Sequence, residues 1–126
     1  MNRKEILKTV NLSRFTAFDF ETTGLDSMAD RIIEIAAIRF EDGEITDRFV
    51  TLVNPGQPIS PMITRITGIS DEMVRDKPQE EEIIDELLAF LGEDPLVAHN
   101  IRFDQSFLRS LCERCNRDEV TNPLYD

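Results

Sequence analysis

The sequence has 126 residues, and its 25 acidic and 14 basic side chains give a formal net charge of −11. This length suits one small domain with a single core. The charge repels a phosphate backbone, which disfavours a protein that binds nucleic acid by nonspecific electrostatic attraction. A phosphate site bridged by divalent cations stays open, because such a site needs carboxylates rather than lysines.

No apolar run is long enough to cross a bilayer, and residues 1–13 mix charged and polar side chains too closely for a signal peptide. We therefore treat 1–13 as a leader and 14–126 as the domain, and expect a cytoplasmic protein with no membrane partner. Cys112 and Cys115 form a CxxC pair, but zinc would need two further ligands and the chain has one histidine. Ordinary buried thiols in a reducing compartment are expected instead.

Three strands are predicted in the first half of the chain. Residues 14–20 are rich in aromatic and β-branched side chains, and the turn-forming residues 22–24 follow them. Residues 31–40 form a longer apolar run, and residues 45–53 alternate between apolar and polar side chains. The glycine-containing residues 41–44 (EDGE) connect these two strands as a hairpin turn, so the three strands are antiparallel.

A proline-rich segment ends this part of the sheet. Residues 54–61 hold three of the six prolines, which cannot continue a strand ladder. Short helices are predicted over 62–67 and 71–74, with Gly68 between them and Ser70 as the N-cap of the second.

The second half of the chain predicts helix, strand and helix. Residues 79–91 keep apolar side chains at helical spacing, and acidic residues cover the start and the outer face. Residues 96–98 read as a short buried strand, and a second amphipathic helix runs from about 103 to 115. The order predicts an α/β fold, a mixed sheet flanked by helices. Residues 121–126 begin to resemble another strand and then stop, so we expect the C-terminal part of the fold to be missing.

The main candidate site is FDFETTGL, residues 18–25. Asp19 and Glu21 alternate with Phe18 and Phe20 along a strand, so both carboxylates can face one hard cation while the rings face a core. In so acidic a chain an Asp-x-Glu pair also arises by chance, and it would then be a solvated surface pair. Carboxylates inside an apolar strand cost desolvation free energy unless something compensates them, which favours the ligand interpretation.

A second candidate is VAHNIRFD, residues 97–104, which crosses from the short strand into the next helix. Asp104 lies near the start of that helix, where the helix dipole favours its ionised form. It is therefore a natural third partner for Asp19 and Glu21. The alternative is a helix-start acid with no ligand role.

Together these two stretches resemble the DnaQ-like 3′-5′ exonucleases of the DEDD superfamily, DEDDh type, and among them the proofreading exonucleases of the DNA polymerase III epsilon family. DFETTGL resembles their first motif and VAHNIRFD their second. ITRITGISDEMV, residues 63–74, is similar to the segment that links them, so the resemblance runs from about Arg14 to Asp126. It implies a ribonuclease-H-like fold.

The resemblance implies hydrolysis that releases nucleoside monophosphates from a nucleic acid 3′ end with two Mg²⁺ or Mn²⁺ ions. By motif position, Asp19 would bind both ions, Glu21 the catalytic one and Asp104 the other. DNA is the more expected substrate, with a DNA polymerase as candidate partner in proofreading. An RNA exonuclease of the same superfamily and a noncatalytic nuclease-like binding module are the alternatives.

Seven further residues of the two motifs are implied to contact the substrate. These are Thr22, Thr23, Gly24, Leu25, His99, Asn100 and Phe103. The two threonines and Gly24 would offer backbone and hydroxyl donors, and Leu25 would pack against the base, with a plain loop contact as an equal alternative. Histidine is a common general base, but His99 is assigned a positioning role together with Asn100, and Phe103 is expected to pack.

The sequence departs from the family at the third motif, HxxxxD, which supplies the base histidine and a fourth carboxylate. No histidine follows Asp104 in these 126 residues. Neither group is identified in them, and the loss of a general base costs roughly a hundred- to ten-thousandfold in rate. The chain alone is therefore expected to be nearly inactive.

Overall fold

A computed structural model describes residues 13–126, so the prediction of a leader over 1–13 lies, apart from Ser13, outside the described residues. The described elements are β1 (Arg14–Thr22), β2 (Ile32–Glu41), β3 (Glu44–Leu52), α2 (Pro61–Thr67), α3 (Asp71–Val74), α4 (Glu80–Leu91), β4 (Leu96–Val97), α5 (Ile101–Arg114) and β5 (Leu124–Tyr125). None of the helices in this part of the chain is long and apolar enough to span a membrane.

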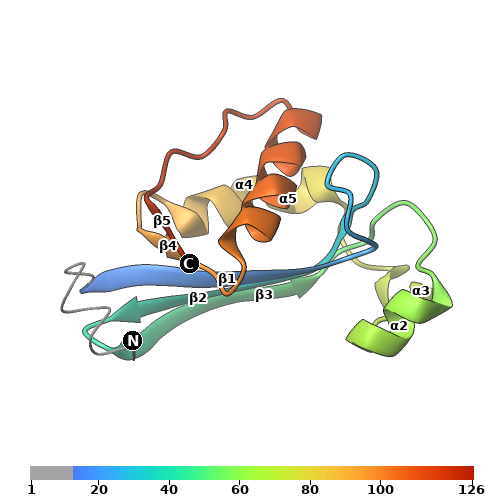
Figure 1. The fold of residues 1–126 in the computed structure, drawn as a ribbon, viewed down its shortest axis with the longest axis horizontal. Helices are drawn as coiled ribbons and strands as arrows, with labels where there is room; N and C mark the ends of the chain where they lie inside the picture. Colours follow the sequence, from blue (N-terminus) through green and yellow to red (C-terminus); the bar gives the residue numbers. More distant parts are fainter. Residues whose placement is uncertain (1–12) are drawn as a thin grey trace.

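One mixed sheet organises the fold, with the strand order β3-β2-β1-β4-β5. β1, β2 and β3 are antiparallel, whereas β4 pairs parallel to β1 and β5 pairs parallel to β4. α4 and α5 cover one face of the sheet, and α2 and α3 lie beyond one of its ends (Figure 1). The predicted α/β class and the predicted order of elements are confirmed.

β1 ends later than predicted. It continues past Phe20, and Thr22 still pairs with Ile32. Between Glu21 and Thr22 the register shifts, because Glu21 pairs with Glu34 and β2 therefore carries Ile33 as an extra residue. Such a bulge redirects side chains locally. The sequence pattern of β1 did not reveal it, because the extra residue belongs to β2.

Two neighbouring residues of β2 at the bulge belong to different cores. Ile32 belongs to the main core between the sheet and the helices α4 and α5, where Leu87 and Phe107 are fully buried. Its neighbour Ile33 belongs to a smaller core, with Ile59, Ile69 and Val74, around α2 and α3. Consecutive side chains of a strand face opposite sides of the sheet. This end of β2 therefore contributes to both the main core and the smaller core.

The predicted turns and caps are confirmed. In the β2–β3 hairpin, Asp42 and Gly43 have φ angles of 51° and 84°, the two positive values that a tight two-residue turn requires. Ser70 caps α3 by accepting a hydrogen bond from the Met73 backbone N–H. Cys112 and Cys115 at the end of α5 are free and buried, and burial raises the pKa of both thiols.

Candidate metal centre

The alternation predicted for β1 is present. Phe18 and Phe20 are buried in the main core, whereas Asp19 is exposed and Glu21 is half-buried. The two carboxylates therefore share the face of β1 opposite the two rings, next to the bulge. Both lie at the carboxyl end of the strand.

Asp104 reaches the same strand from α5. β4 pairs only with Thr16 and Ala17, so it ends before it could accept the Phe20 backbone N–H. The Asp104 Oδ1 atom accepts that N–H instead, at an N···O distance of 3.1 Å. Asp104 is only 2% exposed. The first turn of α5 thus places a buried carboxylate where a longer β4 would have continued.

The pKa values of Asp104 and Glu21 are both raised. Burial is the main cause that raises the pKa of Asp104 to about 6; the Phe20 N–H opposes this, and Asp19 and Glu21 add to it. The pKa of Glu21 is raised by burial first and then by Asp19 and Glu34. The charges of Asp19 and Glu21 therefore act on Asp104.

Within residues 13–126, these three carboxylates have no basic side chain as an ion-pair partner. Three mutually repelling carboxylates, one of them buried, match the oxygen donors that Mg²⁺ and Mn²⁺ take alongside bound waters. Within the same residues, however, no three His, Cys, Asp or Glu side chains are gathered closely enough to hold an ion. The carboxylate oxygens therefore suit Mg²⁺ or Mn²⁺ chemically, and the roles of Asp19, Glu21 and Asp104 as ligands stay a prediction.

The hydroxyl groups predicted to reach a nucleotide are already used in the loop after β1. Thr22 Oγ1 donates to the Gly24 carbonyl at 2.6 Å, and Thr23 Oγ1 contacts Gln57 Oε1 at 2.6 Å. By contrast, the backbone N–H groups of Gly24 and Leu25 have no acceptor among the described residues. Leu25 is 88% exposed, so it does not make the plain loop-core contact that was the alternative to base packing.

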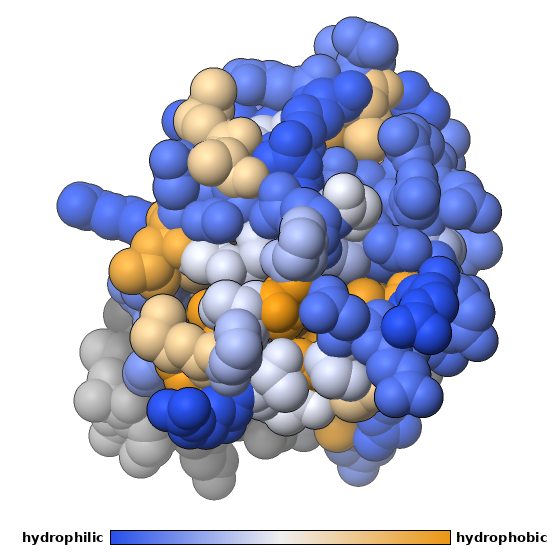
Figure 2. Space-filling view, turned by 90° about the vertical axis from the view of Figure 1, so that its right-hand side faces the viewer, coloured by the Kyte–Doolittle hydropathy of each residue, from blue (hydrophilic) through white to orange (hydrophobic). Residues whose placement is uncertain are grey.

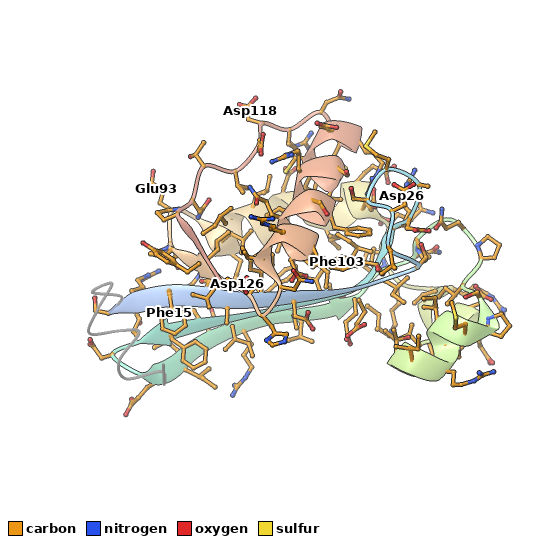
Figure 3. All side chains as sticks on the ribbon, in the orientation of Figure 1. Phe15, Asp26, Glu93, Phe103, Asp118 and Asp126 are labelled. Carbon is orange, nitrogen blue, oxygen red and sulfur yellow. The ribbon has the colours of Figure 1, made fainter. Side chains whose placement is uncertain are left out.

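The remaining predicted residues lie at the start of α5. His99 and Asn100 are exposed, and the Asn100 carbonyl accepts the N–H groups of Phe103 and Asp104 while its side chain makes no capping bond. Phe103 is half-buried and packs on Phe107, with ring centroids 4.9 Å apart. Figure 3 shows Phe103 at the sheet-side end of α5, and Asp26 in the neighbouring loop. Their substrate roles stay predictions.

Sequence reasoning missed Glu34, Asp30 and Gln57. Glu34 lies directly across from Glu21 on β2, and the hairpin register could have found it. Asp30 and Gln57 contact Thr23, and Gln57 comes from a segment whose prolines indicate only a loop. A cavity of about 400 Å³, lined in part by Arg31 and Arg114, includes none of the three carboxylates and is therefore separate from the candidate metal centre.

Apolar side chains are exposed near this end of the molecule. Leu25 and Met28 in the loop after β1, and Met62 and Ile66 in α2, are each at least 60% exposed. Figure 2 views this end, where apolar surface lies among hydrophilic surface.

Comparisons with known proteins show the family of this chain. The exonuclease family RNase_T matches residues 16–126. A DNA polymerase III PolC-type of Halalkalibacterium halodurans is 41% identical over 90% of this chain, and that of Thermotoga petrophila is 48% identical over 75%. The chain spans only about 8% and 7% of the length of these two relatives.

Solved structures of exonuclease I share the fold. Its complex with an SSB C-terminal segment has a TM-score of 0.80 at 25% identity and covers 90% of this chain and 28% of that one. The E. coli enzyme with a dA16 oligonucleotide has a TM-score of 0.81 at 24% identity, with the same coverage. The family match and these likenesses confirm the resemblance to DnaQ-like 3′-5′ exonucleases and the ribonuclease-H-like fold. This chain belongs to the RNase_T exonuclease family.

Proposed function

We propose that this chain carries the metal site of a 3′-5′ exonuclease that removes nucleoside monophosphates from DNA 3′ ends, with proofreading as its setting. The observation that carries the proposal is the group of three carboxylates without a cation partner, Asp19 and Glu21 from β1 and Asp104 from α5. The PolC-type relatives are DNA polymerases, and exonuclease I is known with a bound oligonucleotide, which supports DNA as substrate and a polymerase as partner.

In this proposal the three carboxylates hold two Mg²⁺ or Mn²⁺ ions. When bound, such ions activate a water and offset charge on the phosphate and on the leaving 3′ oxygen. The Phe20 N–H orients Asp104 through Oδ1 and leaves the Oδ2 atom of that carboxylate for a ligand. The bulge beside Glu21 directs its side chain at the strand end.

The loop after β1 would receive the terminal nucleotide. The free N–H groups of Gly24 and Leu25 are donors for it, and the exposed Leu25 side chain would pack against its base. Exposed His99 and Asn100 would line its path with Phe103 beside them. Because the net charge is −11, the bound ions rather than basic side chains would attract the phosphate.

The chain by itself should be slow. Its single histidine is His99, which we assign to positioning, and no residue of the 126 is assigned as the general base. A missing base lowers the rate by roughly a hundred- to ten-thousandfold. RNA stays the alternative substrate, because no described contact identifies a residue that reads the sugar. A noncatalytic binding module is the alternative from another class. A cytoplasmic location belongs to the proposal.

Metal binding tests the ligand roles without relying on catalysis. Mn²⁺ titrated into the 126-residue chain and followed by electron paramagnetic resonance should bind, and Asp19→Ala should weaken the binding at least tenfold. Asp118→Ala is the matched control, because Asp118 is an exposed acid in the segment after α5, apart from Phe103 in Figure 3. Equal affinities for Asp19→Ala and Asp118→Ala would refute the metal assignment.

A nuclease assay tests the reaction. With protein in excess, 5′-labelled oligonucleotides should shorten from the 3′ end only when Mg²⁺ or Mn²⁺ is present, and Asp19→Ala should abolish the shortening. The rates of shortening of DNA and RNA strands of the same sequence, compared side by side, show whether the enzyme prefers deoxyribose or ribose. Tight Mn²⁺ binding with no shortening at any protein concentration would favour the binding module.

A further inference from the structure

The loop between β1 and β2, residues 23–31, is held in place from outside as well as from within. Arg114 on α5 donates to the Ser27 carbonyl at 3.4 Å and pairs with Glu80 of α4 at 2.7 Å. This contact fastens the part of the loop near the helices. The part that follows β1 has a different support.

That second support is Gln57, from the segment between β3 and α2. Its Oε1 atom lies 2.6 Å from Thr23 Oγ1, and its Nε2 atom donates to the Ala29 carbonyl at 3.2 Å. One side chain therefore joins the first residues of the loop to the last. The Thr23 hydroxyl also accepts the Arg31 N–H at 2.9 Å, which leaves its own proton for an acceptor.

The hydroxyl proton of Thr23 has two acceptors within reach. Asp30 Oδ1 is 3.2 Å away, whereas Gln57 Oε1 is 2.6 Å away and makes the shorter contact. Asp30 is also engaged by the Asp26 N–H at 2.9 Å, and it packs against Gly24 so closely that a Cβ there would lie 2.6 Å from its Cγ. Thr23 therefore links Gln57 to Asp30, and Asp30 in turn holds the Asp26 backbone inside the loop.

Gln57 is itself held in place. The side chain of Asn54 accepts the Gly56 N–H at 2.9 Å and donates to the Arg75 carbonyl at 3.2 Å. Gly56 has a φ of 68°, a left-handed conformation that glycine adopts without strain. The turn before Gln57 is therefore anchored to the C-terminal end of α3, independently of β1.

We propose that Gln57 is a positioning residue: it holds the loop so that the Gly24 and Leu25 backbone N–H groups face the 3′-terminal nucleotide. The inference rests on the function proposed above. Among the described residues, the Gln57 side chain makes its hydrogen bonds to Thr23 and Ala29 and none to a carboxylate of the site. It acts through Thr23, whose position decides where the next two amides point. Two hydrogen bonds to the loop are lost if its amide is removed.

The test uses the 126-residue chain, labelled with ¹⁵N, and thymidine 5′-monophosphate with Mg²⁺ as the probe. The amide signals of Gly24 and Leu25 report nucleotide binding, and Mn²⁺ titration reports the carboxylates separately. Gln57→Leu should weaken nucleotide binding about tenfold and leave Mn²⁺ affinity unchanged. Gln57→Glu keeps the acceptor for Thr23 and loses the donor to Ala29. Its nucleotide affinity should therefore lie between those of wild type and Gln57→Leu.

The matched control is Ser60→Ala. Ser60 lies in the same segment, but its hydroxyl caps α2 by accepting the Ile63 N–H. It should lower thermal stability without weakening nucleotide binding, so a general loss of structure is separated from a loss of positioning. Equal nucleotide affinity in wild type and Gln57→Leu would overturn the inference and leave the proposed function standing. If the Gly24 and Leu25 amide signals of wild type do not respond to the nucleotide, both the inference and the proposed function are overturned.

Discussion

Asp104→Asn should stabilise the metal-free protein above pH 6. The amide has nearly the shape of the carboxylate, so its Oδ1 can still accept the Phe20 N–H. What the substitution removes is a buried negative charge that faces Asp19 and Glu21. The amide NH₂ group would donate toward these two carboxylates instead of repelling them. A residue that we propose as a metal ligand would then lower the stability of the metal-free protein.

The magnitude follows from the pKa of Asp104, which is raised from 3.8 to about 6. Below about pH 3 the carboxyl is neutral in both the folded and the unfolded chain. Between about pH 3 and 6 the unfolded chain releases its proton first, so the folded state loses stability as the pH rises. One pKa unit is worth about 1.4 kcal/mol, and screening by solvent at the exposed side of the site leaves on the order of 2 kcal/mol.

Thermal unfolding followed by far-UV circular dichroism measures this difference. In EDTA at pH 8, Asp104→Asn should melt about 6–8 °C above wild type, and at about pH 3 the two should melt together. Carboxylates that titrate in both proteins cancel in the comparison. Added Mg²⁺ should raise the melting temperature of wild type and not that of the variant. A wild type that is at least as stable as Asp104→Asn at pH 8 in EDTA would refute the reasoning.

Three further substitutions test the packing around the site. Phe107→Ala should cost about 3–5 kcal/mol in urea unfolding, because its ring is fully buried between α5 and the sheet. Gly24→Ala should weaken nucleotide binding through the clash with Asp30, and the double variant with Asp30→Ala should lose less than the sum of the single losses. Arg114→Met should cost about 3 kcal/mol, since it leaves the largely buried Glu80 carboxylate unpaired; a change below 0.5 kcal/mol would show that solvent reaches that pair.

Periodicity and turn chemistry predicted the elements well for a local reason. The hairpin at Asp42 and Gly43 needs two positive φ angles, and the cap at Ser70 needs one hydroxyl next to a helix start. Each depends on a few consecutive residues. The end of β1 was predicted too early, because the pairing of Thr22 with Ile32 depends on a partner strand and on a bulge in it.

Alternation along one strand already determined that Asp19 and Glu21 share a face and that Phe18 and Phe20 share the other. Motif spacing singled out Asp104 as their partner. Only the tertiary structure decided that Asp104 is buried, because a β4 of two residues leaves the Phe20 N–H to a side chain of α5. It also decided that Gln57 holds the loop beside the site: Thr23 and Gln57 are 34 positions apart, and hydrogen bonds between such distant residues depend on the packing of whole layers, which no local pattern encodes.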